Sequence, residues 1–358
     1  MRNTTKDRLS GVRSLLRSWT TPLLPDDYSS LINPLWSTRE LRGIIRAVDR
    51  NVAAETVLLD INPGWGVPVA FAAGQYIGIG VQVDGRFVWR SYSIVNPPTS
   101  SRRSFQICVR AVDNGKLSQH LLHEARPGQH VRLAAPAGDF HLTDPLPEKL
   151  LFLTAGSGIT PVISMLRFLA DRAQLNDVTL VHSIREPEDL VFGDTLRKLG
   201  DDHPNFRFIL RVTSLEGRIT PHEIEELVPD CAERAPYACG PAEMLAELET
   251  WWGRGVEKRY ALRTEQFTLD RMSDAQGGRI QFGDRGQACT DGATTILEAA
   301  ESAGVQLPFG CRMGICQTCV QPLKEGRAHN LRTGETHEAG SRVRVCCTVA
   351  NGDITLDI

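Results

Sequence analysis

The chain has 358 residues, of which 41% are hydrophobic and 23% are charged, and its formal net charge is −3. This length is enough for two or three domains, and the small net charge argues against a nucleic-acid partner, which requires a basic surface. No apolar run reaches the ~18 residues of a membrane span and no secretory signal is evident, so we expect a cytoplasmic protein.

Residues 1–36 form a leader rich in arginine. If its first half is helical, Leu9, Val12, Leu16 and Trp19 share one face at spacings of three and four residues, with arginines elsewhere. Two interpretations remain open. The segment packs on the protein's own surface, or it makes a peripheral contact with the inner face of the membrane.

Short β-rich runs separated by glycine and proline turns fill residues 37–146. Examples are "ETVLLDI", "QYIGIGVQV", "FQICVRAV" and "HVRLAAP". This pattern predicts an antiparallel β-barrel, for which we expect six strands.

From residue 147 the pattern changes to strand, glycine turn and helix, which predicts a parallel α/β nucleotide domain over 147–262. The polar stretch 263–275 has little strand signal and predicts a linker. Residues 276–358 then form a separate small domain. The chain is therefore expected to be a multidomain protein.

Five of the nine cysteines lie between residues 311 and 347. Cys311, Cys316 and Cys319 have the spacing C-x4-C-x2-C, which is the plant-type [2Fe–2S] pattern, and Cys346 or Cys347 can supply the fourth thiolate. A structural zinc site usually pairs its ligands as two C-x2-C motifs, so zinc fits less well. The sequence predicts an iron–sulfur cluster.

The stretch "GCRMGICQTC" resembles the cluster loop of plant-type ferredoxins, and its surroundings resemble the α+β fold of a β-grasp ferredoxin domain. In relatives with such a domain at the C-terminus, the last ligand commonly lies seven residues before an aspartate of the closing strand. Cys346 lies seven residues before Asp353. The resemblance therefore implies Cys346 as the fourth ligand, with Cys347 as the alternative.

The residues Arg90, Ser91, Tyr92 and Ser93 resemble the R-x-Y-S signature of the ferredoxin reductase family. An arginine can pair with a flavin phosphate, a tyrosine ring can cover the isoalloxazine, and a serine hydroxyl can reach its N5 region. The resemblance implies a flavin site in which Ser93 is catalytic.

The stretch "NGKLSQHL" matches the second flavin element of this family, with Gly115, Lys116, Leu117 and Ser118 at the start of a helix whose free N–H groups can face a pyrophosphate. The following "PAGDFHL" closes the barrel as in members that bind FAD, so FAD is expected, with FMN as the alternative.

The stretch "LTAGSGITP" places Gly156, Ser157, Gly158 and Thr160 between an apolar strand and a helix, where backbone N–H groups can hold a dinucleotide pyrophosphate. Together with "YACGPAEML" it resembles the nicotinamide domain of the same family. There, a C-G-P motif brings Cys239, Gly240 and Pro241 to the site of hydride transfer, which implies a catalytic position for Cys239.

After the second strand of this domain, Ser183 and Arg185 are candidates to bind a 2′-phosphate, and no acidic residue stands there to bind two ribose hydroxyls. We therefore expect NADPH as the donor, with NADH as the alternative. The neighbouring His182 is expected to be a structural hydrogen-bonding residue.

Three motif sets thus occur in the order flavin, nicotinamide, cluster, and the resemblance to the ferredoxin reductase family covers residues 37–358. It implies an NADPH-dependent reductase that passes electrons from FAD to a [2Fe–2S] cluster. The leader and the domain order resemble reductases that serve membrane acyl-CoA desaturases. The alternatives are a reductase component of a soluble oxygenase or hydroxylase, and a zinc-stabilised binding module without redox activity.

Overall fold

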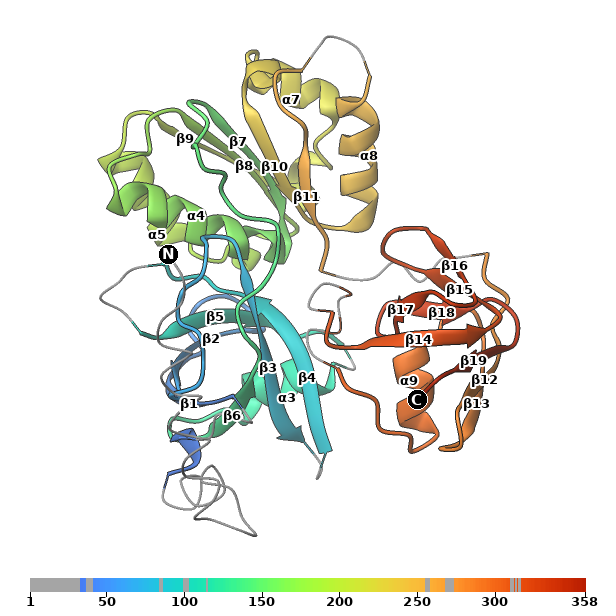
Figure 1. Ribbon diagram of the computed structural model, residues 1–358. Helices are drawn as coiled ribbons and strands as arrows, with labels where there is room; N and C mark the ends of the chain where they lie inside the picture. Colours follow the sequence, from blue (N-terminus) through green and yellow to red (C-terminus); the bar gives the residue numbers. More distant parts are fainter. Residues whose placement is uncertain are drawn as a thin grey trace.

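The computed structural model describes residues 33–36, 41–83, 86–98, 103–113, 115–254, 258–267, 274–309, 312, 314 and 317–358. Within these residues the chain forms three bodies in sequence order, namely an antiparallel barrel, a parallel α/β layer and a small α+β domain (Figure 1). This arrangement confirms the expected fold class. No helix among the described residues is both long and apolar enough to cross a membrane.

The first body is a six-stranded antiparallel sheet in the order β4-β3-β6-β1-β2-β5. A bridge between Ile94 and Ile107 joins the end of β4 to β5 and closes the sheet toward a barrel. Its interior is filled by alternating aliphatic side chains of the strands together with Leu117 and Leu121 of helix α3. The elements are β1 (Arg42–Asp49), β2 (Thr56–Pro63), β3 (Tyr76–Val83), β4 (Arg86–Ser93), β5 (Phe105–Arg110), α3 (Lys116–His123) and β6 (His130–Leu133), with the 3-10 turn η1 (Pro34–Trp36) before them.

The second body is a five-stranded parallel sheet in the order β11-β10-β7-β8-β9. Separate hydrophobic clusters cover its two faces, which explains why β7, β8 and β10 are buried along almost their whole length. The strands are β7 (Leu150–Ala155), β8 (Val178–Ile184), β9 (Phe206–Val212), β10 (Ala235–Cys239) and β11 (Arg263–Glu265). The helices are α4 (Ile159–Asp171), α5 (Gly193–Asp202), α6 (Thr213–Glu216), α7 (Pro221–Leu227) and α8 (Ala242–Trp252), with 3-10 turns η2 (Gly156–Gly158), η3 (Pro187–Asp189) and η4 (Cys231–Glu233).

The expected linker over 263–275 begins with a strand that the sequence analysis missed. Strand β11 pairs in parallel with β10, with Glu265 opposite Cys239. The hydrogen bonds come from the neighbouring strand, so a polar Arg-Thr-Glu segment can form an edge strand without an apolar pattern of its own. The nucleotide sheet therefore extends into the predicted linker.

Helix α4 links the first two bodies. Ser164 donates a hydrogen bond to the carbonyl of Asn96 (2.9 Å), and Arg167 donates one to the carbonyl of Val95 (3.0 Å). One hydrophobic cluster contains Val95 and Phe140 of the barrel region as well as buried residues of α4. The barrel and the nucleotide sheet consequently share a core.

The third body contains a five-stranded sheet in the order β13-β12-β19-β14-β17 and a three-stranded sheet in the order β16-β15-β18. Helix α9 (Ile296–Ser302) begins at a capping box of Thr295 and Glu298 and buries Ile296 and Leu297 in this domain's core. The strands are β12 (Gly278–Phe282), β13 (Gln287–Thr290), β14 (Val320–Glu325), β15 (Arg327–Asn330), β16 (Thr336–Glu338), β17 (Arg342–Arg344), β18 (Thr348–Ala350) and β19 (Ile354–Leu356).

The leader prediction falls largely outside the described residues. Of residues 1–36, the structure describes 33–36. Cys311 and Cys316 also lie outside the described residues, as do three other positions of the cluster loop, 310, 313 and 315.

Candidate functional site

The four residues predicted to bind flavin occupy the last half of β4, at the edge of the six-stranded sheet. Burial raises the pKa of Tyr92, against the opposing charge of Arg90, so the phenol stays neutral and presents a ring rather than a charge. Ser93 is 4% exposed, and its buried Oγ has no protein hydrogen-bond partner. A buried hydroxyl without a partner is costly unless a ligand completes it, so Ser93 fits a bound flavin.

The second predicted flavin element forms the start of α3. Ser118 Oγ donates to the carbonyl of Gly115 (3.1 Å) and accepts from the N–H of Val112 (3.3 Å), while Leu117 is buried in the barrel core. Gly115 is the N-cap of α3 and makes no side-chain cap, so the first helical N–H groups, including that of Lys116, have no capping side chain. Helix α3 contacts β4. The structure thus brings the two predicted flavin elements to the same part of the barrel.

The glycine loop of the nucleotide domain is the tight turn η2 between β7 and α4. Gly156 adopts φ +53°, and Thr160 donates to the carbonyl of Ser157 (2.9 Å). A Cβ on Gly158 would lie 2.0 Å from the carbonyl oxygen of Cys239, so only glycine permits this approach. Gly158 and Cys239 are 81 positions apart in the sequence, so the fold brings the two nucleotide motifs together.

Cys239 ends β10 and is fully buried, and burial raises the pKa of its thiol. Gly240 follows it, and Pro241 is the N-cap of α8. Opposite Cys239 in the sheet lies Glu265, whose buried Oε2 has no protein hydrogen-bond partner. Burial raises the pKa of Glu265 to about 8, against the opposing charge of Arg332 from the third domain. The sequence analysis missed Glu265 because it fell in the predicted linker.

A cavity of about 330 Å³ opens beside the glycine loop. It brings together the predicted residues Gly156, Ser183, Arg185 and Pro241. Its lining is completed by Arg110, Ala155, Ile184, Asp189, Thr213, Arg218, Ile219, Glu243, Met244 and Glu247. This cavity lies at the carboxyl ends of parallel strands, where open α/β sheets bind nucleotides.

Two arginines of this cavity differ in their surroundings. The side chain of Arg185 is 85% exposed and lies 4.0 Å from Glu186. Arg218 forms an ion pair of 2.8 Å with Glu243. The sequence analysis missed Arg218 because it comes from the loop after β9, and only the fold carries that loop to the Ser183 strand end.

His182 has the structural role that the sequence predicted. Its ring is fully buried, and Nδ1 lies 2.8 Å from Thr154 Oγ1. Burial lowers the pKa of His182 to about 4, so the ring is neutral near pH 7.

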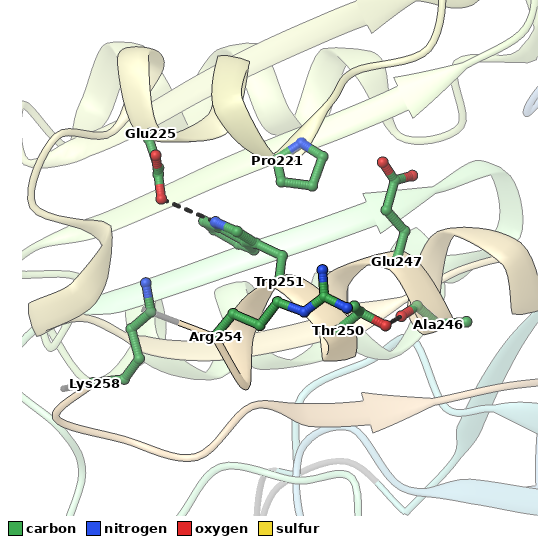
Figure 2. A pocket seen from close by; sticks show the side chains of 8 residues that line it. All are labelled: Pro221, Glu225, Ala246, Glu247, Thr250, Trp251, Arg254 and Lys258. Carbon is green, nitrogen blue, oxygen red and sulfur yellow. Dashed lines mark hydrogen bonds between the residues drawn. The ribbon is translucent and has the colours of Figure 1, made fainter. Parts of the chain in front are cut away.

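A second, more open hollow lies on α7, α8 and the segment after α8, and contains none of the predicted site residues (Figure 2). Within it the indole N–H of Trp251 donates to Glu225 (2.9 Å). The ammonium group of Lys258 lies 5.1 Å from the centroid of the Trp251 ring. These side chains satisfy one another, so the hollow shows no unpaired buried group that points to a ligand.

The cysteine cluster is partly described. Cys319 Sγ and Cys346 Sγ lie 3.1 Å apart, and the N–H of Gly314 donates to Cys346 Sγ (3.2 Å). Cys347 is fully buried and lies 3.5 Å from the carbonyl of Arg344. Converging thiols with a backbone donor are the environment that an iron–sulfur cluster needs. The described residues of the loop therefore fit the cluster.

The chemistry of this arrangement follows from its three parts. When bound, FAD accepts two electrons with a hydride and passes them on singly to a one-electron cluster. The protein's own residues bind and orient: Gly158 lets the glycine loop approach the end of β10, and Ser93 offers a buried hydroxyl. Burial of Cys239 and Glu265 keeps water from the end of that strand.

Comparisons with known proteins match all three parts. Residues 65–142 match the oxidoreductase FAD-binding domain, residues 152–250 the oxidoreductase NAD-binding domain, and residues 282–351 the 2Fe-2S iron-sulfur cluster binding domain. The iron–sulfur match removes the support for a zinc-stabilised module without redox activity.

Over 352 residues the chain is 48% identical to a Mycobacterium tuberculosis protein named NADPH oxidoreductase. This match covers 97% of this chain and 92% of the relative. It is 28% identical over 319 residues to the glycine betaine monooxygenase reductase subunit of Pseudomonas aeruginosa, covering 80% of this chain and 87% of the relative. The solved structure of phthalate dioxygenase reductase has the same fold, with a TM-score of 0.65 at 22% identity over 89% of this chain and 98% of that one. From the three domains and the 48% identity together, the chain belongs to the ferredoxin reductase family, as a NAD(P)H-dependent oxidoreductase with FAD-binding, NAD-binding and 2Fe-2S ferredoxin domains.

Proposed function

We propose that this reductase takes a hydride from NADPH and delivers single electrons through its cluster to a separate oxygenase component. The observation that carries the proposal is the junction of Gly158 with the Cys239 strand end, in a chain that also holds the Cys319–Cys346 sulfur pair. A nucleotide site and a one-electron centre in one chain are what a converter of electron pairs into single electrons requires.

The residue assignments are part of this proposal. In the flavin site, Arg90, Ser91, Tyr92 and Ser93 act with the start of α3. Cys239 lies at the hydride-transfer position. Cys346 completes the cluster set of Cys311, Cys316 and Cys319. The converging geometry of the described members supports these roles.

The preference for NADPH is proposed from charge. Ser183, Arg185 and Arg218 all line the cavity beside the glycine loop, and two guanidinium groups suit a 2′-phosphate better than a bare ribose. The name of the Mycobacterium tuberculosis relative, NADPH oxidoreductase, supports the same donor.

The oxygenase acceptor is proposed from relatives. The Pseudomonas aeruginosa protein is named as the reductase subunit of a monooxygenase, and the chain covers 87% of it. Nothing in the described residues or in these names supports the acyl-CoA desaturase that the sequence analysis expected.

The leader, residues 1–36, is the reason to test an acyl desaturase as a second candidate acceptor. The 48% identical relative covers 97% of this chain and so leaves out about 11 residues, fewer than the 36 of the leader. The monooxygenase reductase subunit covers 80%. Most of the leader is therefore shared with the first relative. If the leader contacts a membrane rather than the protein's own surface, a membrane-bound diiron acyl desaturase is the acceptor that this contact would serve.

Reconstitution separates these acceptors. The full-length protein and a variant without residues 1–20 are supplied with NADPH and mixed with either a soluble oxygenase component or an acyl desaturase in anionic vesicles. We expect turnover with the oxygenase that does not depend on the leader. Turnover with the desaturase alone, lost on truncation, would replace the oxygenase proposal. If neither acceptor turns over while a soluble dye is reduced normally, both acceptor assignments are refuted and the reductase chemistry stands.

A further inference from the structure

An aromatic contact joins the flavin barrel to the ferredoxin domain. The rings of Trp89 on β4 and Phe309, which follows α9, have centroids 6.3 Å apart and are nearly perpendicular at 84°. In Figure 1 the ferredoxin domain lies beside this edge of the barrel, where β4 is the edge strand. The two residues are far apart in sequence, so only the packing of domains brings them into this edge-to-face geometry.

Each ring is held by its own domain. The indole of Trp89 lies over Gly80 of the paired strand β3, where a Cβ would come within 2.5 Å of the ring. Phe309 lies under the guanidinium of Arg312, 4.1 Å from the ring centroid, and Arg312 in turn forms an ion pair with Glu301 of α9. Both rings are half-buried and packed against residues of their own domains, so each is held in place where the two domains meet.

The contact lies between the two redox motifs. Trp89 directly precedes Arg90 of the flavin signature, and Phe309 stands two residues before Cys311 of the cluster motif. The main-chain carbonyl of Trp89 also accepts a hydrogen bond from the Arg90 side chain (2.8 Å). In each domain the contact therefore lies next to residues assigned to the flavin or to the cluster.

We propose that Trp89 and Phe309 are positioning residues that hold the cluster at its working distance from the flavin. The inference rests on the cofactor placement of the proposed function. One electron leaves the reduced flavin and is taken up by the oxidised cluster, and no covalent bond forms or breaks between them. NADPH supplies the electrons in pairs, and the external acceptor removes them one at a time.

The test uses the full-length holoprotein and four variants: Trp89→Ala, Trp89→Phe, Phe309→Ala and the double alanine variant. Stopped-flow absorbance follows flavin reduction by NADPH and then cluster reduction by the flavin. Small-angle scattering reports the separation of the domains independently of activity. The matched control is Trp65→Ala, because Trp65 belongs to the same domain but is 69% exposed.

We expect Trp89→Ala and Phe309→Ala each to slow cluster reduction about tenfold or more, because loss of the contact lets the two domains move apart, the rate of electron transfer falls steeply as the separation of the redox centres grows, and precise positioning contributes rate factors of this order. Flavin reduction, flavin content and iron content should stay unchanged. Trp89→Phe should recover most of the rate, and the double variant should be no slower than the slower single variant, because both act through one contact. The alanine variants should also be more extended in solution.

Unchanged cluster reduction in both alanine variants would overturn the inference and show that other contacts, such as the approach of Arg332 to Glu265, fix the ferredoxin domain. Equal slowing by Trp65→Ala would also overturn it. A loss of flavin reduction in the parent protein would instead refute the proposed function.

Discussion

At the residue scale, the side chains that mark the site are buried polar groups that the protein itself does not satisfy. Ser93 Oγ and Glu265 Oε2 are examples, the first on the flavin strand and the second beside the end of β10. Buried donors and acceptors are normally paired. An unpaired one either lowers the stability of the protein or is paired by a ligand when that ligand binds. Their positions beside the predicted motifs favour a ligand.

The fourth cluster ligand is the first residue-scale prediction. Cys346 lies 3.1 Å from Cys319 and accepts the Gly314 N–H, whereas Cys347 lies against the Arg344 carbonyl. We therefore expect Cys346→Ser to lose iron and sulfide while keeping flavin, and Cys347→Ser to keep both. Metal and sulfide analysis of the purified variants is the measurement, with exposed Cys289→Ser as the control. The reverse pattern would make Cys347 the ligand.

Nucleotide choice gives a second prediction. Replacing Arg185 by alanine should raise the KM for NADPH far more than that for NADH, because a charge-assisted phosphate contact contributes ~1.5–3 kcal/mol. Arg218→Ala should act in the same direction but less, since Arg218 must first leave its ion pair with Glu243. Steady-state kinetics with both donors measures this, and Arg197→Ala in α5 is the control. Equal changes for both donors would show that Arg185 does not contact the 2′-phosphate.

Glu265 gives a third prediction, on stability. Its carboxyl titrates near 4.5 when unfolded and at about 8 in the folded protein, so the folded state binds more protons between these values. The free energy of unfolding should therefore fall as pH rises through that window, by up to about 1.4 kcal/mol per pH unit.

Glu265→Gln should remove this part of the pH dependence, because an amide carries no charge at any of these pH values. Thermal unfolding of the variant and the parent from pH 5 to pH 8 measures the difference, and exposed Glu247→Gln serves as the control. Parallel pH profiles of parent and Glu265→Gln would contradict a raised pKa.

At the element scale, the backbone of the turn η2 lies in direct contact with the backbone at the end of β10. The carbonyl of Cys239 occupies the space that a side chain at position 158 would need, so turn and strand end pack backbone to backbone. Gly158 is also the N-cap of α4 and provides no capping side chain, so the first N–H groups of this helix suit a pyrophosphate.

Gly158→Ala tests this approach. Its Cβ would lie 2.0 Å from backbone, which cannot move as a flexible side chain does, so we expect a loss of stability of ~1–3 kcal/mol and a higher KM for the nucleotide. Gly200→Ala in α5 is the matched control, because its Cβ meets nothing within 4 Å and should be neutral or stabilising by ~1 kcal/mol. Denaturant unfolding compares them. An undisturbed Gly158→Ala protein would show that the turn relaxes easily.

At the scale of the whole molecule, the three domains form a route for electrons. The barrel and the nucleotide sheet share a core, and an exposed arginine of β5, Arg110, also forms an ion pair of 2.7 Å with Asp189. The ferredoxin domain meets the barrel through Trp89 and Phe309. The first two domains are therefore joined by a shared hydrophobic core as well as by an ion pair.

Electron counting gives the whole-molecule prediction. FAD holds two electrons and the cluster one, so anaerobic titration should require about 1.5 equivalents of NADPH per chain for full reduction. Absorbance and the paramagnetic signal of the reduced cluster measure the end point. An end point near one equivalent, without a cluster signal, would show that the chain lacks a functional cluster. The Cys346→Ser variant provides that comparison in the same protein.

The sequence by itself determined the features that depend on local spacing. Three motifs each lie within ten residues: the C-x4-C-x2-C loop, the glycine turn after an apolar strand, and the R-x-Y-S strand. In such short segments the spacing along the chain by itself brings the side chains of a motif close together. The alternating and continuous apolar runs likewise predicted the barrel strands β2, β3, β5 and β6 and the parallel strands β7 and β8.

Only the tertiary structure decided which distant residues meet. Glu265 lies beside the site because β11 pairs with β10. The polar Arg-Thr-Glu sequence of β11 does not predict this pairing. Arg218 reaches the Ser183 strand end because consecutive loops of a parallel sheet share one edge. Trp89 meets Phe309 because two domains pack, and such a contact leaves no periodicity in either segment. A local sequence pattern reflects interactions between residues close together in the chain, so it predicts strands, helices and turns. These three contacts depend instead on how whole elements and domains pack.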